Sequence, residues 1–169
     1  MADLWSDKRK GRGFVVSPLY VANNLIITGR DTNASMTHLK LQKMVYMLYA
    51  RFLAKHDASL FSNRFVAWQY GPVLTEIYDA FKKYGSRNIE EPRKNGDGLI
   101  MIVAEEGAFR GCFEEVWAKY ERYSGSALVK VTHEEGSAWY KAVLRDNKMY
   151  GGFLDDKHIR DDGERWFSN

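Results

Sequence analysis

The sequence predicts a mainly α-helical protein, a compact bundle of six or seven helices with a small β-sheet. Apolar residues recur at helical spacing through most of the chain, and several of these segments begin at a Ser, Thr or Asp that can cap a helix. Only two short apolar runs have the composition of strands. With 169 residues, 45% of them hydrophobic, the chain is long enough to bury one core, so we expect one domain.

The first two helices are expected on either side of a polar turn. Ser17 and Pro18 are typical of an N-cap and a first helical position, and Gly29 marks the expected end. Thr37 is the expected N-cap of the second helix. Gln42 falls inside the apolar face of that helix. Because a buried amide without partners costs about 1–3 kcal/mol, we expect Gln42 to hydrogen-bond backbone from another part of the chain.

A short strand is expected over residues 64–70, where apolar and aromatic residues are dense. Gly71 and Pro72 are expected to end it and to open a third helix, with the proline at the first helical position. Tyr78 lies on the expected core face of that helix. A second short strand is expected over residues 99–103.

The C-terminal half is predicted to be a series of helices. The longest runs over residues 106–123, and Ser124, Ser137 and Asp155 are the expected N-caps of three shorter ones. Residues 1–13 are a basic N-terminal extension, typical of either a nucleic-acid-binding arm or a solvated chain end.

Composition restricts the class of protein. No run of about 18 apolar residues occurs, and the N-terminus lacks the apolar core of a signal peptide, so we expect a cytoplasmic protein. Cys112 is the single cysteine, which excludes an internal disulfide and a thiolate zinc cage. We interpret it as a small core residue. No metal or cofactor motif is present, so neither is expected.

Two patterns suggest chemistry, and each has a second interpretation. His133, next to two glutamates, is typical of a general base or of a capping and hydrogen-bonding cluster between short helices. No nucleophile lies near it in sequence, so we favour the cluster and expect no enzyme. The basic stripe, which opposes the apolar face of the second helix, is typical of a solvated surface or of a nucleic-acid site; it consists of Lys40, Lys43, Arg51 and Lys55. Met44 and Met47 border it and suggest an adaptable protein-binding surface.

Trp68 and Tyr70 also have two interpretations. They are either core aromatics of a strand-to-helix turn or the lining of a surface groove beside Lys40 and Lys43. In the second case that groove is the candidate partner site.

Three segments form a recognisable set when taken together. They are Thr37-His38-Leu39-Lys40-Leu41-Gln42-Lys43-Met44-Val45-Tyr46, Ala67-Trp68-Gln69-Tyr70-Gly71-Pro72-Val73 with Ile77-Tyr78, and Tyr123-Ser124, Leu128, Thr132-His133 and Trp139. In this order and spacing they resemble the Panacea domain of SocA-like and GepA-like proteins, found in bacterial and prophage toxin–antitoxin operons. The resemblance covers roughly residues 18–167, so residues 14–169 are expected to form one such domain. The chain departs from the pattern at residues 134–138, where relatives often place a proline next to the tryptophan.

The resemblance implies a cytoplasmic, mostly helical antitoxin that neutralises a cognate toxin by direct protein binding. One branch of the family resembles a proteolytic adaptor that delivers its toxin to the ClpXP protease. The alternatives are a DNA-binding regulator of its own operon or prophage, and a small hydrolase built on His133. The positions that match the motifs are expected to be structural; these are Thr37, Gln42, Gly71, Pro72, Tyr78, Ser124, Thr132, His133 and Trp139.

Overall fold

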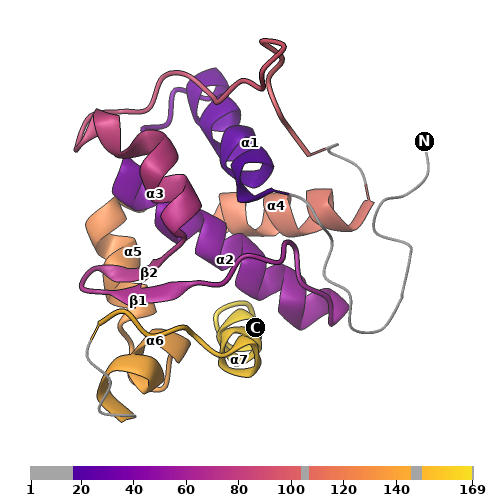
Figure 1. The fold of residues 1–169 in the computed structure, drawn as a ribbon. Coiled ribbons are helices and arrows are strands. Elements are labelled where there is room, and N and C mark those ends of the chain that lie inside the picture. The colour runs from indigo at the N-terminus through magenta and orange to yellow at the C-terminus, as the bar shows by residue number, and fades with distance from the viewer. Residues whose placement is uncertain (1–16, 104–106, 146–149, 169) are drawn as a thin grey trace.

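A computed structural model describes residues 17–103, 107–145 and 150–168 (Figure 1). Within these ranges the chain forms seven α-helices and one two-stranded antiparallel sheet. The prediction of a mainly helical protein with a small sheet is confirmed. The predicted basic extension, residues 1–13, lies outside the described residues.

The fold is organised around α2 (His38–His56). Helices α1 (Pro18–Asp31), α4 (Gly107–Tyr120), α5 (Gly125–Thr132) and α7 (Asp156–Arg165) all pack against it (Figure 1). These neighbours leave residues 38–54 of α2 buried or half-buried, and its exposed residues are Lys55 and His56 at the C-terminal end. None of the described helices is both long enough and apolar enough to cross a lipid bilayer.

The five N-caps that the sequence predicted, all Ser, Thr or Asp, are confirmed. Each cap accepts a hydrogen bond from a backbone N–H in the first turn of its helix, which contributes about 0.5–2 kcal/mol. The five caps are Ser17, Thr37, Ser124, Ser137 and Asp155. Ser137 caps α6 (Ala138–Tyr140), which continues into a π-helical turn, Lys141–Arg145.

The prediction that Gly71 and Pro72 open a helix is wrong. They lie on β2 (Gly71–Val73), which pairs with β1 (Val66–Trp68), and α3 (Thr75–Phe81) begins two residues later. The other edge of β1 is covered by hydrogen bonds with residues 151–154. Pro72, which has no N–H to donate, therefore lies on the outer strand, where proline is tolerated. A 3-10 turn, Lys82–Tyr84, follows α3.

Residues 99–103 do not form the predicted strand. They make a single bridge, between Lys94 and Ile100, and Leu99 hydrogen-bonds Asn95. Side chains of α1 hold the rest of this segment. Asn23 hydrogen-bonds backbone of Arg93 and Met101. Asn24 does the same with the N–H and the carbonyl of Val103. Amide side chains thus replace the strand partner that this apolar run lacks.

The end of α1 also differs from the prediction. The helix continues past Gly29 to Asp31. A Cβ on Gly29 would lie 3.0 Å from the carbonyl oxygen of Ala34. Gly29 therefore allows close packing of the next turn and does not stop the helix.

Helices α6 and α7 are fixed to α2 by one buried carboxylate. Asp162 accepts hydrogen bonds from the Tyr46 hydroxyl at 2.6 Å and from the Ala138 N–H at 3.1 Å. Beside it, Gly163 lies directly against the backbone of Ala50, where an added Cβ would be 2.0 Å from the carbonyl oxygen. The hydrogen bond to Asp162 holds the start of α6, next to Trp139, against this crossing of α7 and α2.

Candidate functional site

Lys43 is buried beneath the hairpin, where the first two motif segments meet. Its side chain is fully inaccessible, and its Nζ donates to the Pro72 carbonyl at 2.9 Å. A Cβ on Gly71 would lie 2.7 Å from both Lys43 Cε and the Thr132 hydroxyl oxygen. The backbone φ of Gly71 is +105°, which side chains other than glycine rarely adopt, and the close contact leaves no room for a Cβ. Position 71 therefore requires glycine for both reasons.

The third motif segment also supports the hairpin. The rings of His133 and Trp139 stack with centroids 3.6 Å apart and planes 9° apart. The Trp139 indole N–H donates to the Trp68 carbonyl at 2.8 Å. All three segments that carry the family resemblance therefore converge on the hairpin.

Gln42 links α2 to the start of α3, as the sequence predicted. It is 3% exposed, its amide nitrogen donates to the Leu74 carbonyl at 3.0 Å, and its amide oxygen accepts from the Leu74 N–H at 3.1 Å. Leu74 occupies the N-cap position of α3 without a side-chain hydrogen bond of its own. The expectation that Gln42 is buried and tied to distant backbone is confirmed.

An aromatic groove of about 520 Å³ opens between the hairpin, the start of α2 and α3. On its rim, Tyr70 is 60% exposed, Tyr150 55% and Tyr78 38%. Trp68 is half-buried and packs edge-on against Tyr78, with ring centroids 4.9 Å apart. The residues that line the aromatic groove are His38, Leu39, Gln42, Lys43, Trp68, Gln69, Tyr70, Val73, Tyr78, Gly85 and Tyr150.

The inner wall of the aromatic groove is basic and holds no acid. Burial lowers the pKa of Lys43 to about 7, with no carboxylate of the described residues acting against it. The pKa values of His38 and His133 are lowered mainly by burial and, to a smaller extent, by the charge of Lys43. The Nε2 atoms of both histidines are buried without a hydrogen-bond partner among the described residues. The aromatic rim thus lies above buried basic side chains, of which Lys43 is fully inaccessible.

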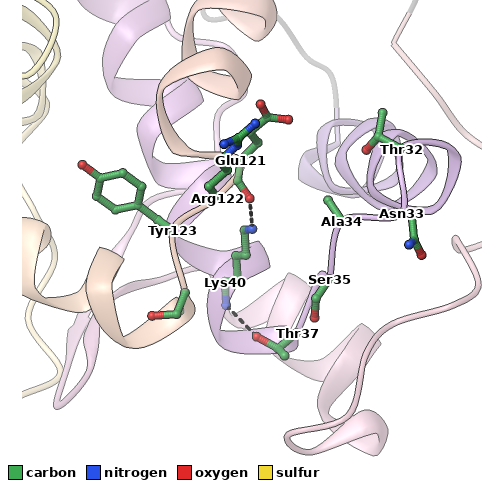
Figure 2. Close-up of a pocket in the computed structure, with 11 residues that line it drawn as sticks. Thr32, Asn33, Ala34, Ser35, Thr37, Lys40, Glu121, Arg122 and Tyr123 are labelled. Atoms are coloured by element: carbon green, nitrogen blue, oxygen red, sulfur yellow. Dashed lines mark hydrogen bonds between the residues drawn. The ribbon is translucent and has the colours of Figure 1, made fainter.

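Lys40 does not lie beside Trp68 and Tyr70, contrary to the sequence expectation. It is 5% exposed and borders a second groove, between the α1–α2 turn and the α4–α5 turn (Figure 2). Its Nζ donates to the Glu121 carbonyl, and its N–H donates to the cap Thr37 (Figure 2). Lys40 thereby joins the two turns.

The predicted exposed basic stripe does not exist as a surface. Lys40 and Lys43 are buried, because α4, α5 and the hairpin cover the side of α2 that carries them. Arg51 and Lys55 form ion pairs with Glu115 of α4, at 2.5 and 2.6 Å.

The expected methionine border of that stripe is wrong as well. Met44 and Met47 are fully buried core residues. Cys112 is also in the core, as expected, and burial raises the pKa of its thiol to about 11. Among the described residues, no group of three His, Cys, Asp or Glu side chains is placed to hold a metal ion.

Two groove residues were not identified from the sequence. His38 lies four residues before Gln42, so the two share one face of α2. The polar Gln42 within an apolar arc was the available signal, and extending that face by one turn would have reached His38. Tyr150 enters the groove through the pairing of residues 151–154 with β1, which no local pattern indicates.

Comparison with known proteins gives two findings. The family model described as "Antitoxin SocA-like, Panacea domain" matches residues 41–140. Antitoxin SocA of Caulobacter vibrioides (strain NA1000 / CB15N) is 30% identical over 124 residues, which are 70% of this chain and 66% of that protein. The match thus spans just under two thirds of the relative's length. No solved structure gives a significant match.

Proposed function

This chain belongs to the family of SocA-like antitoxins with a Panacea domain, and from that premise we propose that it neutralises a cognate toxin by binding it directly. The observation that carries the proposal is the aromatic groove, on which the three motif segments converge. Its rim is the proposed contact surface.

The exposure of each groove aromatic indicates whether we propose a structural or a binding role for it. Trp68 is half-buried, and its backbone carbonyl receives the Trp139 indole, so it supports the hairpin. Tyr70 and Tyr150 project from the groove rim with more than half of their surface exposed. Tyrosine is enriched among the residues that dominate binding energy, since it offers a large rigid surface with a polar tip.

We propose stoichiometric sequestration as the mode of action. Delivery to ClpXP is the alternative within the same function, because it also begins with toxin binding. The two differ in dose: a sequestering antitoxin protects in proportion to its amount, whereas an adaptor protects below equivalence when protease and ATP are present.

The two other functions considered from the sequence have lost their structural support. DNA binding required an exposed basic stripe, but two of its members are buried and two are paired with Glu115. Hydrolysis required a nucleophile at His133. The ring stacks on Trp139, and the neighbouring Thr132 hydroxyl donates to the Val129 carbonyl.

The test is a calorimetric titration of the purified chain against the toxin encoded by the neighbouring gene, with toxin activity measured at each ratio. We expect binding at a fixed ratio and loss of toxin activity in proportion to occupancy. Inactivation at substoichiometric amounts without protease, or no binding at all, would contradict the proposal. A parallel reaction with ClpXP and ATP, followed by toxin degradation, tests the adaptor alternative.

The site is tested by Tyr70→Ala, with Tyr123→Ala as the matched control. Both side chains are exposed, at 60% and 39%, but Tyr123 borders the second groove. We expect Tyr70→Ala to weaken toxin binding at least about tenfold without lowering the melting temperature, as for a central interface aromatic. Equal affinities of the two variants would exclude the groove rim as the contact.

A further inference from the structure

We propose that residues 99–103 form the edge of a homodimer, in which they pair as an antiparallel strand with the same residues of a second copy of this chain. Self-association of this kind is a property beyond toxin binding and does not depend on it. The sequence predicts a strand over these residues, and the described part of the chain provides bonding partners for only one of its edges.

The odd-numbered residues of this segment are bonded toward α1 and the preceding turn. The Leu99 N–H donates to the Asn95 side chain, and the Leu99 carbonyl accepts from the Asn95 N–H. The Met101 carbonyl accepts from the side chain of Asn23 at 2.7 Å. Both backbone groups of Val103 bond the neighbouring asparagine of α1. Every second residue is therefore bonded in one direction, which is the pattern of an extended strand with one satisfied edge.

The even-numbered residues, Ile100 and Ile102, carry the other edge. In an extended strand their N–H and C=O groups point away from those of their neighbours. Among the described residues, no hydrogen bond reaches any of these four groups. Both side chains are exposed, at 42% and 48%, and Figure 1 shows the segment as an extended stretch beside α1. An unpaired apolar edge of this kind is a template for pairing with another strand.

The register of the four free groups identifies the second strand. They belong to two residues that flank Met101 symmetrically. In an antiparallel pair of identical strands with a two-fold axis at Met101, Ile100 lies opposite Ile102 of the second copy and exchanges both hydrogen bonds with it. The symmetry generates a second such pair. One arrangement therefore satisfies all four groups of both copies.

The composition and the length of the segment fit a weak homodimer. Residues 99–103 contain no charged side chain, so two identical strands meet without like charges directly across the pair. The exposed isoleucines lose part of their contact with water, as does Leu99, which is 64% exposed. A strand of this length spans about 17 Å, so the interface is smaller than the roughly 1,200 Å² of a stable complex. We expect a dissociation constant on the order of 100 µM.

Sedimentation velocity of the full chain, from about 10 µM to about 1 mM, tests the self-association. We expect mostly monomer at the low end and mostly dimer at the high end. Ile100→Lys places a charge on the edge and should weaken the dimer at least about tenfold. Leu144→Lys makes the same change at a side chain that is 58% exposed, and it should leave the dimer unchanged. Circular-dichroism melts check that both variants are folded. A monomer at the highest concentration, or a dimer that resists Ile100→Lys, would overturn the proposal.

Disulfide trapping tests the register. With the two-fold axis at Met101, the two Met101 Cα atoms lie about 4.5 Å apart, within the range that a disulfide spans. Leu99 lies opposite Val103, so the two Leu99 positions are about 14 Å apart. With oxidised glutathione as the oxidant, we expect a disulfide-linked dimer from Met101→Cys and none from Leu99→Cys, although Leu99 is the more exposed of the two. The native Cys112 is buried and does not contribute. Equal cross-linking from both positions would overturn the two-fold pairing.

Toxin binding separates this inference from the proposed function. No residue of the segment lines the aromatic groove, so Ile100→Lys should bind the toxin as tightly as the wild type does. If Ile100→Lys loses toxin affinity and the wild type is a monomer at about 1 mM, the edge is a toxin contact and the pairing of two copies is overturned. A dimer with the predicted register that binds no toxin would support the homodimer and contradict the proposed function alone.

Discussion

Replacing Lys43 with methionine should make the protein more stable, and more so at low pH. The side chain is fully buried, and no described carboxylate compensates its charge. Methionine has a similar length and no charge, so it fits the space between Gly71 and Thr132 while it removes the buried amine.

The size of the effect follows from the pKa of Lys43. Burial lowers that pKa from 10.5 to about 7. At about 1.4 kcal/mol for each tenfold change in proton affinity, the ammonium costs about 5 kcal/mol of folding free energy at pH 6 and about 2 kcal/mol at pH 9. Because the folded pKa is depressed, the cost is complete below pH 7 and disappears as pH rises toward 10.5. The lost hydrogen bond to Pro72 offsets part of the gain equally at both values of pH.

The assay is urea unfolding of the wild type and of Lys43→Met at pH 6 and pH 9. We expect the stability difference in favour of the variant to be about 2–3 kcal/mol larger at pH 6. Titrating groups that Lys43 does not influence are shared and cancel, whereas the pKa values of His38 and His133 are lowered by its charge, so removing that charge favours the variant at low pH in the same direction. Lys130→Met, at an exposed site, should give a difference that does not change with pH. A constant difference for Lys43→Met as well would refute the reasoning, because it would mean that the amine is not desolvated in the folded state.

Three further substitutions test the packing that positions the groove. Gln42→Ala removes both hydrogen bonds to Leu74, leaves the Leu74 N–H unpaired and opens a cavity, so chemical denaturation should show a loss of about 2–4 kcal/mol in unfolding free energy. Gln42→Leu keeps the side-chain volume and should lose no more than about 2 kcal/mol. Gly163→Ala should cost at least about 2 kcal/mol because its Cβ meets backbone. Gly111→Ala is also helical, but its Cβ would meet only Lys55 Nζ at 3.9 Å, so it should be neutral or gain up to about 1 kcal/mol. Equal melting temperatures of the two variants would contradict the close crossing. Burial raises the pKa of Asp162 to about 6, from 3.8, so the wild type should lose about 2 kcal/mol relative to Asp162→Asn as pH rises from 4 to 7, and parallel pH profiles would disprove this.

Local signals in the sequence predicted those parts of the fold that depend on local chemistry. A helix N-cap is decided within four residues, so Ser17, Thr37 and Ser124 were identified correctly. Gln42 was placed by the angular spacing of one helix, and its burial followed from the cost of an unpaired amide. Each of these inferences needed no knowledge of neighbouring elements.

The failures concern residues whose surroundings are set by distant elements. Lys40 and Lys43 were expected in solvent because a charged helix face is normally solvated, but α2 is covered on all sides. Pro72 was expected to start a helix, yet its carbonyl accepts from Lys43, twenty-nine residues earlier, and its strand pairs with β1. Nothing within the hairpin sequence carries that information.

The same limit applies to the candidate site. Trp68 and Tyr70 were identified from their motif, and the groove that they line was one of two outcomes foreseen. The buried basic side chains behind the groove were not foreseen, because the burial of Lys43 depends on the hairpin and α5 covering α2.

The most direct test of the account is site-specific photo-crosslinking of the antitoxin to its toxin. A benzoylphenylalanine replaces Tyr70 on the rim of the aromatic groove or, as the control, Tyr123 at the second groove (Figure 2). Each protein is mixed with toxin at equivalence, irradiated and analysed by mass spectrometry. We expect capture of the toxin from position 70 and none from position 123. Capture from position 123 alone, or from neither position in a complex that calorimetry shows to be formed, would contradict it.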